Sequence, residues 1–156
     1  MRRERTELLL VCSAGGHLLQ LLALKDAWEG LSRVWVCDDA SDARSLLRSE
    51  RVVYAFGPPN RSPRNVLRNI LLAVRLVARE RPRVVLTTGA GTAVPFAWAA
   101  RLVGARIVYV ESLSRIDGPS LACRLIAPIA ERVYVQWPEL AEAMPRARYF
   151  GTVLPG

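Results

Sequence analysis

The 156-residue sequence has few of the residues that mark several common protein classes. Its three cysteines, Cys12, Cys37 and Cys123, are widely spaced and form neither a CxxC pair nor a Cys/His cluster, so no metal site is expected. No apolar run reaches the roughly 20 residues that cross a bilayer, and the run Leu8–Cys12 is too short for a signal peptide. The sequence therefore predicts buried thiols in a reducing compartment and at most a peripheral membrane contact.

Lysine and histidine occur once each, as Lys25 and His17, although the net charge is +8. Nearly all of the positive charge is therefore arginine. A basic domain of this kind favours nucleic acid, an anionic membrane surface or a phosphorylated substrate as its partner. Because the sequence has no RNP, helix-turn-helix or KH-type signature, nucleic acid is not expected among its partners.

What the sequence has is a regular alternation of short apolar runs with helical segments. The runs are continuous and rich in β-branched residues, which is typical of a parallel sheet covered by helices on both faces. We expect a single α/β domain over residues 1–156, with a doubly wound, mainly parallel, Rossmann-like sheet. The expected strands are Leu8–Cys12, Arg33–Cys37, Val52–Phe56, Arg83–Thr88, Arg106–Val110 and Arg132–Gln136, followed by an extended piece at Tyr149–Leu154.

Helices are expected between these strands. The segment Ser41–Arg48 has Ser41 as a possible N-cap, and the segment Pro119–Ala130 is expected to bend at Pro128. The other expected helices are Gly16–Trp28, Arg64–Glu80, Ala93–Val103 and Pro138–Met144.

A glycine turn, Ser13–Gly16, follows the first strand and leads directly into the helix that begins near His17. Paired glycines let a backbone approach a phosphate, and the first N–H groups of a helix face such a ligand. The alternative is a purely structural connection, since neither a full GxGxxG pattern nor a Walker A motif is present. The acidic pair Asp38-Asp39 after the second strand makes a dinucleotide site conceivable, but the third glycine of that fingerprint is missing.

A second glycine turn, Gly89–Thr92, follows the fourth strand, and Glu111 ends the fifth. In the common strand order 3-2-1-4-5-6, strands one and four are neighbours, and ligands bind in the crevice at their carboxyl ends. We therefore expect both turns, His17 and Glu111 to converge on one ligand cleft.

An arginine stripe follows the predicted helix Arg64–Glu80. Its four arginines fall within roughly 60° of one another around the helix axis. Either this is a solvated face of a core-packed helix, or the helix lies on anionic lipid. For membrane contact we select Arg64, Arg68, Leu72, Arg75, Leu76 and Arg79, with Val66, Ile70, Ala73, Val74 and Val77 covering the opposite side.

Four segments, spread over nearly the whole chain, carry a family resemblance: Ser13–His17, Thr88–Pro95, Val110–Ser112 with Arg115, and Val133–Glu139. Together they resemble the acceptor-side subunits of split GT-B glycosyltransferases. That group contains bacterial exopolysaccharide and capsule subunits of the PssD/CpsF type. It also contains the eukaryotic endoplasmic-reticulum subunit that completes the UDP-GlcNAc transferase of N-glycan assembly.

The resemblance implies the N-terminal half of a GT-B fold, similar to MurG, which binds the lipid-diphosphate acceptor and contacts the membrane. A separate donor-binding GT-B half would hold the UDP-sugar, and the segment at about 149–156 would dock this partner. The eukaryotic members have a membrane-spanning N-terminus that is not found here. The expectation is therefore a bacterial cytoplasmic protein, peripheral on the inner face of the cell membrane.

The implied reaction is inverting transfer of a sugar from a UDP-sugar to a polyprenyl-diphosphate-linked saccharide in exopolysaccharide or capsule biosynthesis, with no metal or other cofactor. A base must take the proton of the acceptor hydroxyl, and His17 and Glu111 are the two candidates. The alternative function is a non-catalytic scaffold that recruits a complete partner glycosyltransferase to the membrane. The residues expected to bind the acceptor and its diphosphate are Ser13, Gly15, Gly16, Gly89, Gly91, Thr92 and Arg115.

Overall fold

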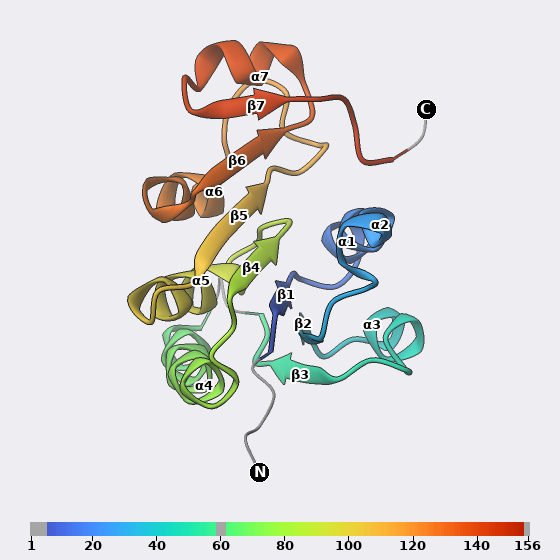
Figure 1. The fold of residues 1–156 in the computed structure, drawn as a ribbon, viewed down its shortest axis with the longest axis vertical. Coiled ribbons are helices and arrows are strands. Elements are labelled where there is room, and N and C mark those ends of the chain that lie inside the picture. The colour runs from blue at the N-terminus through green and yellow to red at the C-terminus, as the bar shows by residue number, and fades with distance from the viewer. Residues whose placement is uncertain (1–5, 59–61, 155–156) are drawn as a thin grey trace.

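The computed structural model describes residues 6–58 and 62–154, and within them the chain forms one seven-stranded sheet (Figure 1). The strand order is β3-β2-β1-β4-β5-β6-β7, and every neighbouring pair is parallel. This confirms the predicted doubly wound α/β fold and its strand order. The strands are β1 Leu8–Val11, β2 Arg33–Asp38, β3 Val52–Ala55, β4 Val84–Thr87, β5 Arg106–Val110, β6 Arg132–Val135 and β7 Ala147–Tyr149.

The helices lie on both faces of this sheet. In Figure 1, α1, α2 and α3 are on one side of the strands, and α4, α5 and α6 are on the other. Their bounds are α1 Gly16–Ala23, α2 Lys25–Trp28, α3 Ser41–Leu46, α4 Pro63–Glu80, α5 Ala93–Leu102, α6 Leu121–Ile126 and α7 Pro138–Ala143, with a 3₁₀ turn at Ala127–Ile129.

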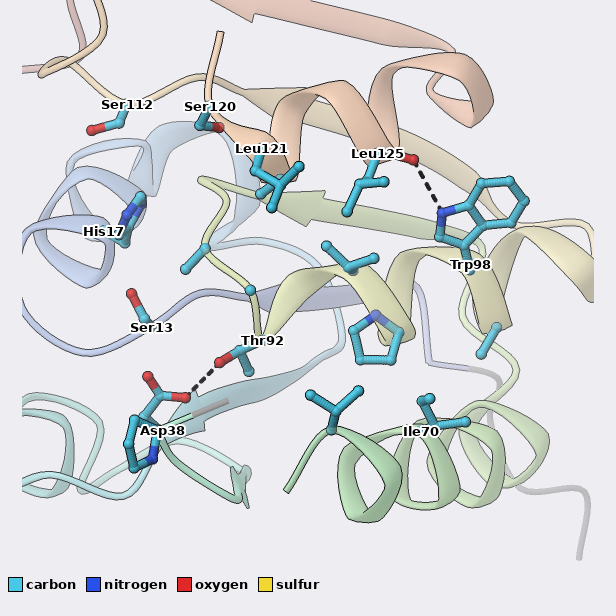
Figure 2. Close-up of a pocket in the computed structure, with 18 of the residues that line it drawn as sticks. Ser13, His17, Asp38, Ile70, Thr92, Trp98, Ser112, Ser120, Leu121 and Leu125 are labelled. Atoms are coloured by element: carbon cyan, nitrogen blue, oxygen red, sulfur yellow. Dashed lines mark hydrogen bonds between the residues drawn. The ribbon is translucent and has the colours of Figure 1, made fainter. Parts of the chain in front are cut away.

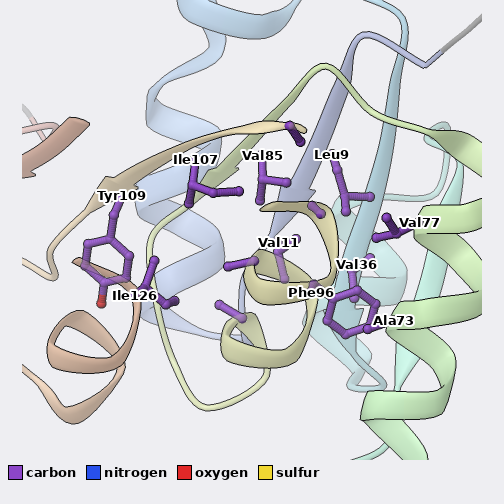
Figure 3. Packing of buried hydrophobic residues seen from close by; sticks show 14 of the residues in the cluster. Leu9, Val11, Val36, Ala73, Val77, Val85, Phe96, Ile107, Tyr109 and Ile126 are labelled. Atoms are coloured by element: carbon purple, nitrogen blue, oxygen red, sulfur yellow. The ribbon is translucent and has the colours of Figure 1, made fainter. Parts of the chain in front are cut away.

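The side chains of β1 alternate between two hydrophobic clusters, one on each face of the sheet. Leu8 and Leu10 pack with the cluster that includes Leu18 of α1. Leu9 and Val11 pack with the cluster that includes Phe96 of α5 (Figure 3). All four strand residues are buried, which explains why the strand is a continuous apolar run rather than an alternating one.

The prediction of one continuous helix over Gly16–Trp28 is wrong. The chain leaves helical geometry at Leu24 and forms two helices, α1 and α2. The indole N–H of Trp28 donates to the Leu21 carbonyl oxygen (2.9 Å), so this carbonyl has a partner without a continued helix. The predicted cap is also displaced. Ala40, not Ser41, precedes the first turn of α3, and no side chain caps it.

The predicted helix Pro119–Ala130 is shorter than expected. It begins after Ser120, whose hydroxyl accepts the Cys123 N–H (3.1 Å), and it tightens into the 3₁₀ turn near Pro128, which has no N–H to continue the α-helical ladder. The predicted extended piece Tyr149–Leu154 is strand only at Tyr149, since β7 pairs with β6 through Ala147–Tyr149.

The three cysteines are buried free thiols, which confirms the prediction for Cys12 and Cys37. The sulfurs of these two lie 3.9 Å apart, Cys12 directly after β1 and Cys37 on the neighbouring β2. Burial raises the pKa of Cys123 to about 12, so that thiol stays protonated. Within residues 6–58 and 62–154, no helix is both long and apolar enough to cross a bilayer.

Candidate functional site

A cleft of about 940 Å³ opens beside the carboxyl ends of β1, β2 and β4 and continues between α4, α5 and α6 (Figure 2). This is the switch point at which the sequence predicted a ligand site. The two ends of the cleft differ in chemistry. Figure 2 shows His17, Ser13, Asp38 and Ser112 at one end, the polar end, and Ile70, Leu125 and Trp98 at the other, the apolar end. The further polar lining residues include Thr92 and Arg115, and the further apolar ones include Val74, Leu102 and Leu121.

His17 lies at the polar end, and its ring is held by Thr88 at the end of β4. The ring Nδ1 is 2.7 Å from the Thr88 carbonyl oxygen, and the Thr88 hydroxyl donates to the His17 carbonyl oxygen (2.7 Å). Because a carbonyl only accepts, Nδ1 carries the proton, and the Nε2 of a neutral ring is left as an acceptor. The fold therefore sets the tautomer that a general base needs.

Asp38 ends β2 and connects the two glycine turns. The Thr92 hydroxyl donates to its Oδ1 (2.6 Å), and the Ala14 N–H also donates to its carboxylate. Burial raises the pKa of Asp38, and the two hydrogen bonds and the charge of His17 oppose that shift. The sequence pointed to this residue only as part of a dinucleotide site. Its place at the carboxyl end of a strand beside the switch point was the better signal.

The first glycine turn delivers two of the predicted residues, Ser13 and His17, to the cleft. Gly15 has a positive φ of 78°, and its N–H donates to Asp42 Oδ2 (2.8 Å), so that amide already has a partner. Gly16 starts α1 and is exposed. A Cβ added to either glycine would meet no atom within 4 Å, so the turn is open around both.

The second glycine turn is packed tightly. Gly89 has a φ of 98°, and a Cβ there would overlap the hydroxyl oxygen of Tyr109. Its N–H donates to the Thr87 hydroxyl (2.9 Å). Gly91 and Thr92 line the cleft as predicted, whereas Gly89 stands behind it.

Glu111 does not line the cleft. Its side chain is fully buried at the end of β5. Its Oε1 accepts from the Ser112 N–H (2.9 Å), the Ser120 hydroxyl (3.0 Å) and the Tyr109 hydroxyl (3.2 Å), and its Oε2 accepts from the Ser120 N–H (2.8 Å). Of the two candidate bases, the structure brings only His17 to the cleft.

The loop between β5 and α6 contributes more of the cleft than the sequence indicated. Arg115 lines the cleft as predicted, and Ser112, Ser114 and Ser120 line it as well. Of the residues in this loop, the sequence resemblance assigned only Arg115 to acceptor binding. Three serines without a spacing motif gave no signal of a binding role.

The membrane-contact prediction on α4 needs correction at its leucines. Leu76 is buried and Leu72 is half-buried against the core, so neither faces outward. The buried Asn69 side chain bonds both the N–H and the carbonyl oxygen of Phe56 (2.8 Å each), which fixes the rotation of α4. The four arginines are exposed, and the exposed side chains of Leu67 and Leu71 lie beside them. Val66, Ile70 and Val74, which were predicted on the opposite side of the helix, are exposed too, because that side of α4 lines the cleft.

Within the described ranges, no three His, Cys, Asp or Glu side chains lie close enough together to hold a metal ion.

The family described as "Oligosaccharide biosynthesis protein Alg14 like" matches residues 37–153, which is most of the chain. The chain belongs to the Alg14-like family. Among its relatives is a UDP-N-acetylglucosamine transferase subunit ALG14 of Eremothecium gossypii, 30% identical over 177 residues, a match that covers 94% of this chain and 79% of that protein. The Homo sapiens subunit of the same name is 28% identical over 183 residues, covering 97% of this chain and 85% of the relative.

The Yarrowia lipolytica subunit is 40% identical, but over only 89 residues, which are 53% of this chain and 41% of that protein. The family match, residues 37–153, includes the cleft-lining residues from Asp38 onward. The finer assignment to the bacterial PssD/CpsF type stays a prediction of the motifs.

Solved structures share the fold. MurG of Acinetobacter baumannii superposes with a TM-score of 0.74 at 18% identity, over 96% of this chain and 47% of that one. The UDP-N-acetylglucosamine 2-epimerase of Rickettsia bellii superposes with a TM-score of 0.71 at 13% identity, over 96% and 46%. This Alg14-like chain thus spans about half the length of the solved structures it matches, and the likeness concerns the fold alone.

Proposed function

We propose that this chain binds the lipid-linked acceptor in a two-subunit glycosyltransferase that transfers a sugar from a UDP-sugar to a polyprenyl-diphosphate-linked saccharide. The observation that carries the proposal is the cleft with one polar and one apolar end. An acceptor of this class has the same division, with sugar hydroxyls and a diphosphate at one end and a hydrocarbon chain at the other.

The apolar end of the cleft is the proposed binding site for the hydrocarbon chain of that acceptor. Leu121, Leu125 and Trp98 come from α5 and α6, and Figure 2 shows Leu125 and Trp98 away from His17, with Leu121 between them and His17. The Trp98 indole N–H donates to the Leu125 carbonyl oxygen (3.1 Å), so its polar atom is satisfied while the ring remains partly exposed. Exposed apolar side chains that line a groove favour a hydrophobic ligand.

The polar end of the cleft is the proposed binding site for the diphosphate and the reacting sugar of the acceptor. Arg115 is the one arginine among the described residues that line the cleft, and the first turn of α1 begins beside His17. A guanidinium and a helix N-terminus both favour phosphate oxygens. Ser13, Gly16, Gly91 and Thr92 complete the proposed phosphate side, with Gly15 and Gly89 shaping the turns behind it.

In the proposed reaction, His17 Nε2 takes the proton from the acceptor hydroxyl as that oxygen attacks the anomeric carbon of the sugar. The nucleoside diphosphate leaves with the bonding electron pair and stays on the donor-binding subunit. The attack from the opposite face inverts the anomeric centre. The relatives' names support UDP-N-acetylglucosamine as the donor, whereas exopolysaccharide or capsule as the product rests on the motif resemblance.

The proposed docking site for the donor-binding subunit is the segment from residue 149 onward, of which residues 155 and 156 lie outside the described range. β7 is an edge strand, and Phe150 beyond it is 80% exposed, in tilted contact with the Tyr134 ring (centroids 6.0 Å apart). An open strand edge beside an exposed aromatic ring favours a protein partner.

The proposed membrane contact is the outer face of α4. Arg64, Arg68 and Arg75 are exposed there, next to the exposed side chains of Leu67 and Leu71. A basic stripe beside an apolar stripe favours an anionic bilayer surface. Such a contact would put the chain on the inner face of the cell membrane, in the cytoplasm, with the apolar end of the cleft near the lipid.

Co-purification of this chain with its donor-binding partner allows a direct test. We expect transfer of sugar to a short-chain polyprenyl-diphosphate saccharide only when both subunits are present. If the partner alone glycosylates a soluble acceptor at the full rate, this chain is a recruiting scaffold and the proposed acceptor role is wrong.

Liposome flotation tests the membrane contact separately. We expect binding to vesicles that contain phosphatidylglycerol, weaker binding to phosphatidylcholine alone, and a several-fold loss with Leu71→Ser. Leu46→Ser is a matched control, since Leu46 is similarly exposed but lies on α3, on the opposite face of the sheet. Equal absence of binding to both vesicles would contradict the contact.

A further inference from the structure

The buried carboxylate of Glu111 receives hydrogen bonds from both ends of the same cleft-lining loop. Ser112 begins the loop and Ser120 ends it, and the backbone N–H of each donates to Glu111, at 2.9 Å and 2.8 Å. The Ser120 hydroxyl adds a third bond (3.0 Å). One side chain therefore holds the two ends of the segment 112–120 together. We propose that Glu111 is a positioning residue, which holds this loop, and Arg115 on it, against the polar end of the cleft.

Arg115 is tied to the first residue of the loop, since its N–H donates to the Ser112 carbonyl oxygen (3.0 Å). The Leu113 N–H donates to Gln20 Oε1 (2.9 Å), and the Trp137 indole N–H donates to the Leu113 carbonyl oxygen (2.6 Å), so the first residues of the loop are held. Beyond them, residues 114–117 are exposed. The placement of Arg115 therefore depends on the hydrogen bonds by which Glu111 holds Ser112 and Ser120, the two ends of the loop.

The same carboxylate also supports the second glycine turn. The Tyr109 hydroxyl donates to Glu111 Oε1 (3.2 Å), and the Tyr109 ring packs directly against Gly89. Burial and the neighbouring carboxylate raise the pKa of Tyr109, so its hydroxyl keeps its proton and remains a donor. Glu111 thus lies behind two walls of the cleft, the 112–120 loop and the Gly89–Thr92 turn.

A chemical role as the base fits this geometry poorly. Both carboxylate oxygens are occupied by donors of the protein, and the side chain is fully buried. Hydrogen bonds to a charged acceptor are stronger than neutral ones, and buried donors that lose their acceptor are costly. Glu111 therefore acts through the loop, and His17 is the group that meets the acceptor hydroxyl.

Trypsin cleavage after Arg115, followed by mass spectrometry, measures the loop directly in the assembled complex. In Glu111→Gln, an amide donor replaces an oxygen that accepted N–H groups, so the loop opens more often. We expect cleavage after Arg115 to increase about tenfold or more, as for the loss of a charged hydrogen bond. Glu50→Gln is the matched control, because Glu50 is a part-buried carboxylate paired with Arg33 (2.8 Å) far from the loop, and its cleavage pattern should not change.

Kinetics supply the second readout, which rests on the proposed function. We expect Glu111→Gln to raise the KM for the lipid-linked acceptor and to leave the KM for the UDP-sugar unchanged. The acid limb of the pH profile, which is the fall in kcat/KM at low pH caused by protonation of the base, should remain. Glu111→Asp should recover part of the acceptor KM. Where Glu111→Gln does not fold, Ser120→Ala removes one donor and should change cleavage and KM in the same direction by a smaller factor.

Unchanged cleavage after Arg115 in Glu111→Gln would overturn the positioning role. So would loss of the acid limb together with a fall in kcat of about 10²-fold or more, which is the behaviour of a general base. The cleavage measurement needs no turnover, so it decides the role of Glu111 even if the complex transfers no sugar and the proposed function fails.

Discussion

The two glycine turns of the sheet are alike in sequence and different in physical role. Ser13–Gly16 follows β1, and Gly89–Thr92 follows the neighbouring β4. Around Gly15 and Gly16 there is open space, whereas Gly89 is pressed against the Tyr109 hydroxyl. In the first turn glycine serves the backbone conformation and access to the cleft. In the second it serves close packing, which in turn holds Gly91 and Thr92 in place.

This difference shows that a glycine at the switch point is not by itself a mark of phosphate binding. The amides of both Gly15 and Gly89 donate to side chains of the protein, Asp42 and Thr87. What each turn brings to the cleft is a side chain next to its glycines, His17 after the first turn and Thr92 at the end of the second. The predictions below test that division, from the largest expected effect to the smallest.

The largest effect should come from His17→Ala. If His17 is the proposed base, its removal is expected to lower kcat by about 10²–10⁴-fold, with the complex still assembled. Sugar transfer by the purified complex measures the rate, and gel filtration measures assembly. Lys25→Ala, an exposed change on the neighbouring helix α2, is the control and should keep the rate. A rate of sugar transfer for His17→Ala within threefold of that of the unchanged chain would contradict the role of His17 as the base.

Gly89→Ala should have the next largest effect, and on stability. Its Cβ overlaps the Tyr109 hydroxyl, and alanine is also disfavoured at positive φ, so we expect a loss of roughly 2–4 kcal/mol in the free energy of unfolding. Tyr109→Phe in the same chain should recover part of it. Urea denaturation provides the measurement.

Gly15→Ala is the matched change in the first turn. Gly15 also has a positive φ, but a Cβ added there would overlap no other atom. The loss in the free energy of unfolding should therefore be about 1 kcal/mol. Equal losses at Gly15 and Gly89 would show that the two turns do not differ as described.

The smallest effect concerns Asp38, which accepts hydrogen bonds from Ala14 in the first turn and Thr92 in the second. Its pKa is raised in the folded state, so the folded chain binds that proton more tightly than the unfolded chain does. The unchanged chain should therefore gain stability relative to Asp38→Asn as the pH falls from 7 to about 4. Thermal unfolding of both proteins across this range measures the difference, and a slope of the opposite sign would contradict the burial of the carboxylate.

Local pattern in the sequence was sufficient for the sheet. Apolar runs such as Leu8–Val11 indicate strands buried on both faces, and the alternation with helices fixes a parallel order and hence the switch point. Ser13, His17, Gly91 and Thr92 could be assigned to the cleft on that basis, because each stands next to the carboxyl end of a central strand, whereas Arg115 was assigned through the family resemblance.

The tertiary structure alone decided what each side chain faces. Glu111 ends a strand like a cleft residue, yet donors at Ser112 and Ser120 turn its carboxylate inward. Asn69 bonds the backbone of Phe56 and so rotates α4, which buries Leu76 and exposes Leu71. The apolar end of the cleft comes from three helices far apart in the chain. Such contacts depend on partners brought together by the fold, and no local periodicity encodes them.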